Sequence, residues 1–125
     1  MISVVIPTHN RKLTLKRALC SVLNQTVSDL DIIVVSDGST DGTNELIEEF
    51  AQNDKRIRLI DYRESKGGNY ARNMGVKVSY SEYIAFLDDD DEWLPQKLEA
   101  QMAVFDSATD IGLVYTGINI IYKDD

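Results

Sequence analysis

Short apolar stretches of the β type alternate with helical patterns along this chain, and that alternation is the strongest constraint on its fold. Strands are predicted at residues 2–7, 30–36, 56–63 and 83–88. Helical patterns follow these strands at residues 12–25, 43–53, 68–79 and 95–105. Parallel strands need a crossover connection, which is usually a helix. The order therefore predicts an α/β, Rossmann-like fold with a mostly parallel sheet flanked by helices.

Residues 111–123 form one more β-type stretch, which predicts a fifth strand that runs on into a sixth. No helical pattern follows it. A length of 125 residues suits one domain. We therefore expect a single domain, residues 1–125, that is the N-terminal part of a longer protein. A sheet cut short in this way would expose an edge through which chains can associate.

The net charge, the cysteine content and the lack of long apolar stretches restrict the ligands and the cellular location that we expect. The chain has 21 acidic and 13 basic residues and a net charge of −8, which argues against non-specific nucleic-acid binding. A phosphorylated ligand still fits, since a metal can bridge two anions. Cys20 is the single cysteine, and neither a leader peptide nor an apolar stretch of membrane-spanning length is visible. We expect a cytoplasmic location, which leaves open a peripheral position at the inner face of a membrane for the full-length protein.

The stretch YIAFLDDDDEW places four consecutive aspartates, Asp88 to Asp91, directly after a predicted strand. One interpretation is a solvated acidic loop. The other is a divalent-metal site, because carboxylates are hard oxygen ligands. Their place favours the second interpretation, since open α/β sheets bind ligands at the carboxyl ends of their strands.

Three other loops end at the same predicted edge: PTHNR, SDGSTDG and RESKGGN. They are rich in polar groups and could converge on a site for a phosphorylated ligand. The second one also matches a calcium-binding EF-hand loop, but it follows a strand instead of a helix. We interpret it as a strand-to-helix turn capped by Thr40 or Asp41. That interpretation leaves Asp37, at the end of the strand, unexplained.

Four motifs, VVIPTHNR, VVSDGSTDGT, GGNYARNMG and YIAFLDDDDEWLPQKL, occur in this order and cover almost the whole chain. Together they closely resemble family 2 glycosyltransferases of the GT-A fold. The resemblance implies inverting transfer of a sugar from a nucleotide-diphosphate donor, with UDP expected, to a saccharide or lipid-linked acceptor. It also implies a role in polysaccharide biosynthesis.

The resemblance assigns donor-binding roles to residues of three loops and of the acidic run. The first loop is expected to lie along the nucleoside, Asp37 to accept a hydrogen bond from uracil, and the ARN motif to lie near the donor. These residues are Pro7, Thr8, Asn10, Arg11, Asp37, Gly68, Asn69, Arg72, Asp88 and Asp89.

The acidic run matches the family's D-x-D element. Asp90 is expected to be the main ligand of Mg²⁺ or Mn²⁺, and Asp88 to lie near the ribose and to share the metal. Asp89 occupies the variable position and Asp91 is a supporting acid. Because all four residues are aspartate, the match to the D-x-D element could be shifted by one position.

The acceptor hydroxyl needs a general base, which the resemblance places beyond Asp125. We therefore expect the chain to bind UDP and metal but to transfer no sugar by itself. A non-catalytic nucleotide- or metal-binding module is the alternative. A nucleotidyltransferase is disfavoured, because the first loop, PTHNRK, lacks the glycines that grip a triphosphate.

Overall fold

The chain folds into a four-stranded, fully parallel sheet with the strand order β3-β2-β1-β4, flanked by helices. The computed structural model describes residues 1–121. The strands are β1 (Ile2–Thr8), β2 (Leu30–Asp37), β3 (Ile57–Tyr62) and β4 (Tyr83–Phe86). The helices are α1 (Lys12–Leu23), α2 (Thr43–Asn53), α3 (Gly68–Val78) and α4 (Lys97–Ser107). The predicted α/β fold is confirmed. None of the described helices has the length and apolar character that crossing a bilayer requires.

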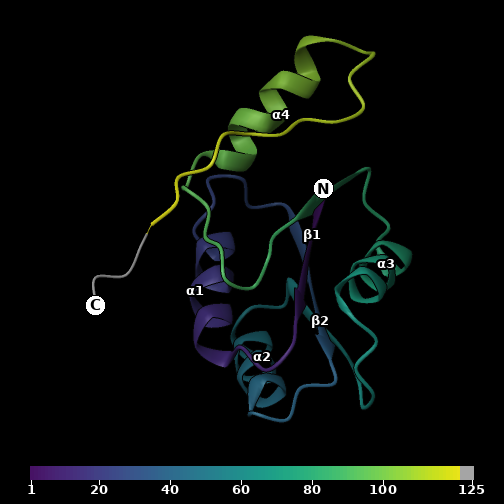
Figure 1. The fold of residues 1–125 in the computed structure, drawn as a ribbon. Coiled ribbons are helices and arrows are strands. Elements are labelled where there is room, and N and C mark those ends of the chain that lie inside the picture. The colour runs from purple at the N-terminus through teal and green to yellow at the C-terminus, as the bar shows by residue number, and fades with distance from the viewer. Residues whose placement is uncertain (122–125) are drawn as a thin grey trace.

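Helices cover both faces of the sheet, with α1 and α2 on one side and α3 on the other (Figure 1). Successive side chains of a strand point to opposite faces. In β1, Val4 and Ile6 therefore enter the larger core beneath α1 and α2, and Val5 enters the smaller core beneath α3. All three are fully buried, so β1 is anchored from both faces, and β2 is anchored in the same way through Val34 and Val35.

Helix α3 approaches β1 closely at Gly75. A Cβ atom on Gly75 would lie 2.3 Å from Cγ1 of Val5, so only glycine fits there. The helix forms despite the low helical propensity of glycine, because this contact secures it against the sheet. The same packing places the first turn of α3 beside the carboxyl ends of the strands.

Strand β4 is an edge strand with one face exposed, although the apolar run of residues 83–87 is of the kind that predicts a buried strand. Tyr83 and Ala85 pack against the larger core, whereas Ile84 is 37% and Phe86 is 49% exposed. The cause is the position of α3, which contacts β1 and β2 and leaves the same face of β4 uncovered.

The predicted fifth strand is wrong for residues 111–121, which have no regular secondary structure. Apolar side chains there are largely exposed, as at Tyr115 and Ile118. Strand propensity alone forms no ladder without a neighbouring strand to accept the hydrogen bonds. The rest of that predicted stretch, including its run into a sixth strand, lies outside the described residues.

Helix α4 is held at the amino-terminal end of the sheet. Gln25, which follows α1, donates from its side-chain amide to the Leu94 carbonyl at 2.8 Å and accepts from the Leu98 amide at 3.1 Å. We expected Pro95 in the first turn of α4, but the helix begins two residues later, at Lys97.

Candidate functional site

A cleft of about 370 Å³ lies at the carboxyl ends of the strands, beside the first turn of α3. Its size suits a small-molecule ligand. The residues that line it come from the ends of β1 and β2, from the loops after β1 and β4, and from α3: Pro7, Thr8, His9, Arg11, Asp37, Gly68, Ala71, Arg72, Asp88, Asp89 and Asp90. The loops that we expected to converge therefore do meet at one site.

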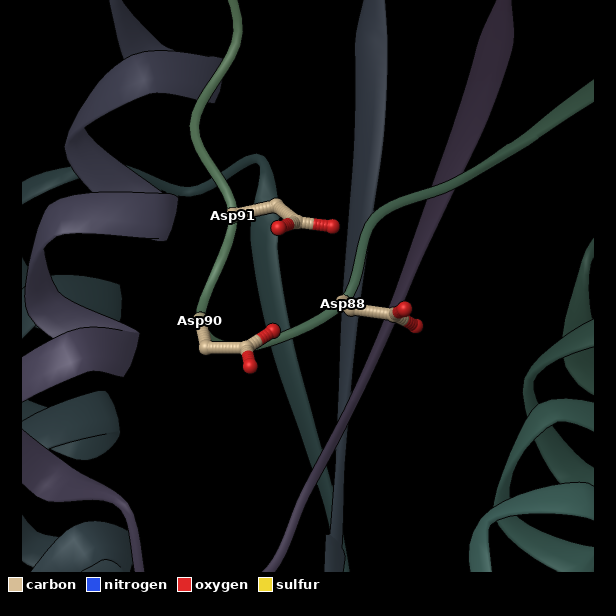
Figure 2. Close-up of side chains that lie close together, drawn as sticks. All are labelled: Asp88, Asp90 and Asp91. Carbon is tan, nitrogen blue, oxygen red and sulfur yellow. The ribbon is translucent and has the colours of Figure 1, made fainter. Parts of the chain in front are cut away.

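Three of the four consecutive aspartates form a cluster, and two of the three, Asp88 and Asp90, line this cleft. One carboxylate oxygen from each of Asp88, Asp90 and Asp91 lies within 4.8 Å of the others, and all three residues are exposed (Figure 2). Three hard oxygen donors at this spacing fit Mg²⁺ or Mn²⁺, which keep several of their ligand positions for water and phosphate. The structure thus brings the two expected metal ligands together and adds Asp91 to them. We call these three residues the acid triad.

Asp89 behaves differently from its neighbours. It is 7% exposed, and its Oδ2 accepts a hydrogen bond from the Thr8 hydroxyl at 2.9 Å. Its Oδ1 lies 3.3 Å from Nη1 of Arg11. Although Asp89 lines the cleft, these contacts tie the loop after β4 to the end of β1. They indicate that Asp89 holds the acid triad in place.

The acid triad carries electrostatic repulsion that a cation would relieve. Partial burial raises the pKa of Asp91, and the charges of Asp90, Asp88 and Asp89 raise it further. Arg17 opposes the shift weakly, and it also donates to the Asp90 carbonyl at 3.2 Å. A cation bound between these carboxylates would neutralise part of their mutual repulsion.

Two arginines face the acidic run from opposite sides. Nη1 of Arg11, from the loop after β1, lies 3.1 Å from Oδ2 of Asp90. Nη2 of Arg72, from α3, lies 2.9 Å from Oδ1 of Asp88. Both guanidinium groups line the cleft, so the site combines carboxylates for a cation with fixed positive charges for an anion.

Asp37 is buried and heavily hydrogen-bonded. Its Oδ2 accepts from the Ser65 hydroxyl at 2.6 Å and the Gly67 amide at 3.0 Å, and its Oδ1 accepts from the Lys66 amide at 2.7 Å. Burial alone would raise its pKa, but hydrogen bonds led by those from Lys66 and Ser65 lower the pKa to about 2. Asp37 thus anchors the loop after β3. Oδ1, with one donor, keeps capacity for a hydrogen bond from a ligand.

Asn10 and Asn69 do not line the cleft, although the sequence placed them in the donor site. Asn10 has a left-handed backbone, with φ of 50°, and accepts from the Thr40 amide at 2.7 Å. It therefore links the loops after β1 and β2. Asn69 lies 3.4 Å from Nη1 of Arg72 and orients that side chain.

His9 and Ala71 line the cleft but were not predicted as site residues. Nδ1 of His9 contacts the Asp37 carbonyl oxygen. A carbonyl only accepts, so Nδ1 carries the proton in this contact. Only the position of His9 in the first strand-end loop could have indicated this. Ala71 faces the smaller core as well, and a small apolar residue in a helix carries no such signal.

The loop after β2 leads into α2, but the N-cap residue is Gly42, whose backbone is left-handed with φ of 91°, and no side chain caps the helix. The expected cap by Thr40 or Asp41 is therefore wrong. Asp41 accepts from the amide and the hydroxyl of Thr43 and, through its other oxygen, from the Lys12 amide at 3.2 Å. Asp41 therefore joins the first residue of α2 to the first residue of α1. Burial raises its pKa, but the hydrogen bonds from Thr43 and Lys12 outweigh this and lower it.

Solved structures share this architecture. The chain superposes on the crystal structure of the 1–349 portion of TarS from S. aureus in complex with UDP-GlcNAc with a TM-score of 0.78. The sequences are 28% identical, and the match covers 85% of this chain and 31% of that chain. The parallel sheet and the cleft at its carboxyl edge thus define a glycosyltransferase domain of the GT-A fold.

The sequence identifies the family within that class. The family model described as Glycosyl transferase family 2 matches residues 3–124, and the chain belongs to this family. The putative teichuronic acid biosynthesis glycosyltransferase TuaG of Bacillus subtilis (strain 168) is 32% identical over 99% of this chain and 49% of its own length.

The Escherichia coli protein WfgD is also similar. Its name is UDP-Glc:alpha-D-GlcNAc-diphosphoundecaprenol beta-1,3-glucosyltransferase, and it is 35% identical over 97% of this chain and 47% of its own length. The chain therefore spans about half the length of these two curated relatives.

Proposed function

We propose that this chain is the donor-binding part of an inverting glycosyltransferase that takes a UDP-sugar together with a divalent metal. The observation that carries the proposal is the acid triad at the carboxyl edge of a parallel sheet, two of whose members, Asp88 and Asp90, line one cleft with Arg11 and Arg72. A pyrophosphate and its metal need this combination of hard anionic ligands and fixed cations.

Each part of the cleft has a role in the proposed reaction. Asp88, Asp90 and Asp91 would hold Mg²⁺ or Mn²⁺, which stabilises the charge that develops on the leaving diphosphate as a Lewis acid. Arg11 and Arg72 carry nitrogen donors into the cleft that can bind phosphate oxygens. The donor's phosphates would then lie between the ends of β1, β4 and α3.

The donor and acceptor are proposed from the relatives. TarS has been crystallised with UDP-GlcNAc, and the name of WfgD specifies UDP-Glc as donor and a diphosphoundecaprenol-linked sugar as acceptor. These names support our proposal that this chain takes a UDP-sugar donor, serves a lipid-linked or other saccharide acceptor, and has a role in polysaccharide biosynthesis. A general base beyond Asp125 and a peripheral position at the inner face of a membrane remain predictions.

Calorimetry with UDP, GDP and CDP, with and without Mn²⁺, tests the nucleotide and metal roles. We expect UDP to bind best, EDTA to weaken its binding, and Asp90→Asn to abolish the benefit of Mn²⁺. Asp106→Asn is the charge-matched control, because Asp106 is exposed on α4, away from the cleft. No binding of UDP under any condition would refute the proposal.

Asp37→Ala tests the assignment of the base. We expect this variant to lose the preference for UDP over CDP and GDP, because the free capacity of Oδ1 is the proposed contact to uracil. Equal binding of the three nucleotides by the unmodified chain would remove that role from Asp37. The metal role of the acid triad would stand independently.

A further inference from the structure

The oxygens that the proposed metal needs already have cationic partners. Arg11 contacts Asp90 and also Asp89, while Arg72 contacts Asp88. A guanidinium keeps its proton at any pH that the protein tolerates. A divalent cation at the acid triad must therefore share its ligands with two permanent positive charges.

We propose that Arg11 and Arg72 make the acid triad selective for a metal–diphosphate complex over the bare metal ion. This inference rests on the proposed function and adds a discriminating role for two residues that were expected only to lie near the donor. The two arginines act as competing cations toward a free metal ion. Toward a diphosphate they act as ligands.

The geometry of the two ion pairs favours such an exchange. Arg11 uses a single nitrogen, Nη1, for both of its carboxylate contacts, and Arg72 reaches Asp88 through Nη2 alone. Arg58, by contrast, binds one carboxylate through two nitrogens: its Nε and Nη2 both donate to Asp31, at 2.9 and 2.8 Å. The cleft arginines therefore retain donors for a second acceptor.

Exposure lowers the cost of releasing the carboxylates. The Arg11 and Asp90 side chains are 55% and 52% exposed, and those of Arg72 and Asp88 are 37% and 53% exposed. Ion pairs in contact with water are weak, since solvent screens them. A phosphate offers more oxygens and more charge than one carboxylate and binds guanidinium groups through paired hydrogen bonds.

The two roles predict effects of opposite sign in the same variant. Removing one arginine charge relieves competition, so Arg11→Gln and Arg72→Gln should each bind Mn²⁺ alone roughly threefold more tightly. Each should also bind UDP roughly tenfold more weakly at saturating Mn²⁺, because a charged hydrogen-bond donor to the diphosphate is lost. A residue that only supports the fold would weaken both.

The experiment measures Mn²⁺ affinity from the electron paramagnetic resonance signal of the free ion, and UDP affinity by calorimetry at saturating Mn²⁺. Lys55→Gln removes the same charge far from the cleft and should leave both affinities unchanged. Circular dichroism verifies folding. If Arg11→Gln unfolds because its contact to the buried Asp89 is lost, Arg72→Gln carries the test.

The outcomes separate the two proposals. Opposite shifts of the two affinities support the inference. Shifts of both affinities in one direction, or no shift of Mn²⁺ affinity, overturn it while the proposed function stands. If the unmodified chain binds neither Mn²⁺ nor UDP, the proposed function fails and the inference fails with it.

Discussion

The Thr8 hydroxyl donates a hydrogen bond to the buried carboxylate of Asp89 at 2.9 Å, and so joins the end of β1 to the loop after β4. This contact divides the run of four aspartates into one anchor and three exposed carboxylates. The position of the acid triad depends on it, because the triad residues lie next to Asp89 in the chain.

Thr8→Val should therefore reduce both stability and metal binding. Valine has nearly the same shape but cannot donate, so the buried Asp89 carboxylate loses a partner, at a cost of about 1–3 kcal/mol. Urea denaturation measures the stability, and calorimetry measures Mn²⁺ and UDP affinity. Thr26→Val is the control, because Thr26 is exposed and its hydroxyl donates to the side chain of Glu99, away from the acid triad. Equal losses in both variants would contradict the anchoring role.

The buried Asp37 should make stability depend on pH in the acid range. Its pKa is about 2, below the ordinary 3.8, so its charged form stabilises the fold. The contribution, about 2 kcal/mol, is fully present above the ordinary pKa and is lost as the pH falls through about 2. Asp37→Asn should lower stability at pH 7 and flatten the dependence between pH 5 and 2.

Denaturation in urea at several pH values tests this. Asp106→Asn removes a similar charge from an exposed site on α4, and its curve should follow that of the unmodified protein. If Asp37→Asn matches Asp106→Asn at every pH, the hydrogen bonds from residues 65–67 do not stabilise the carboxylate.

Gly75→Ala should destabilise the protein although alanine is the better helix former. The gain in helical propensity is about 1 kcal/mol. The added Cβ would lie 2.3 Å from a Val5 methyl group, and overpacking of this kind costs about 1–3 kcal/mol. We expect urea denaturation to show a net loss of stability. The loss caused by Gly75→Ala should be smaller when it is measured in a Val5→Ala background. Gly112→Ala, where a Cβ meets nothing within 4 Å, should be neutral.

The uncovered apolar surface at the edge of the sheet should cause self-association. A groove of about 730 Å³ lies between β4, α4 and residues 111–116, and exposed apolar side chains continue along the segment to residue 121. Unpaired edges and apolar patches favour association. Sedimentation velocity should show a concentration-dependent oligomer that Ile118→Lys weakens. Leu13→Lys, at an isolated exposed position on α1, should leave it unchanged.

The periodicity of the sequence was sufficient to predict most of the fold. β1 and β2 lie between two helical layers, so their continuous apolar runs are typical of buried parallel strands. β4 has a similar composition, but its burial depends on whether α3 covers it, and that is decided by packing. Residues 111–121 show the same limit, because strand propensity does not specify a pairing partner.

The position of the site could be predicted from the sequence, but the different roles of its residues could not. The carboxyl ends of parallel strands meet at one edge, which brought Asp37, Arg72 and the acidic run together. Four identical residues carry no information on which one turns inward. The burial of Asp89 follows from the position of the Thr8 hydroxyl, and the bonds that engage Asp37 come from a loop about 28 residues further along the chain.

The attachment of α4 at the amino-terminal end of the sheet has a practical consequence for sensing. In Figure 1, α4 lies beyond the amino-terminal ends of the strands. The cleft lies at their carboxyl ends. A surface linker on the exposed Ala103 of α4 would immobilise the domain with its binding face toward the solution. Ligand exchange could then be followed on a biosensor chip without obstruction.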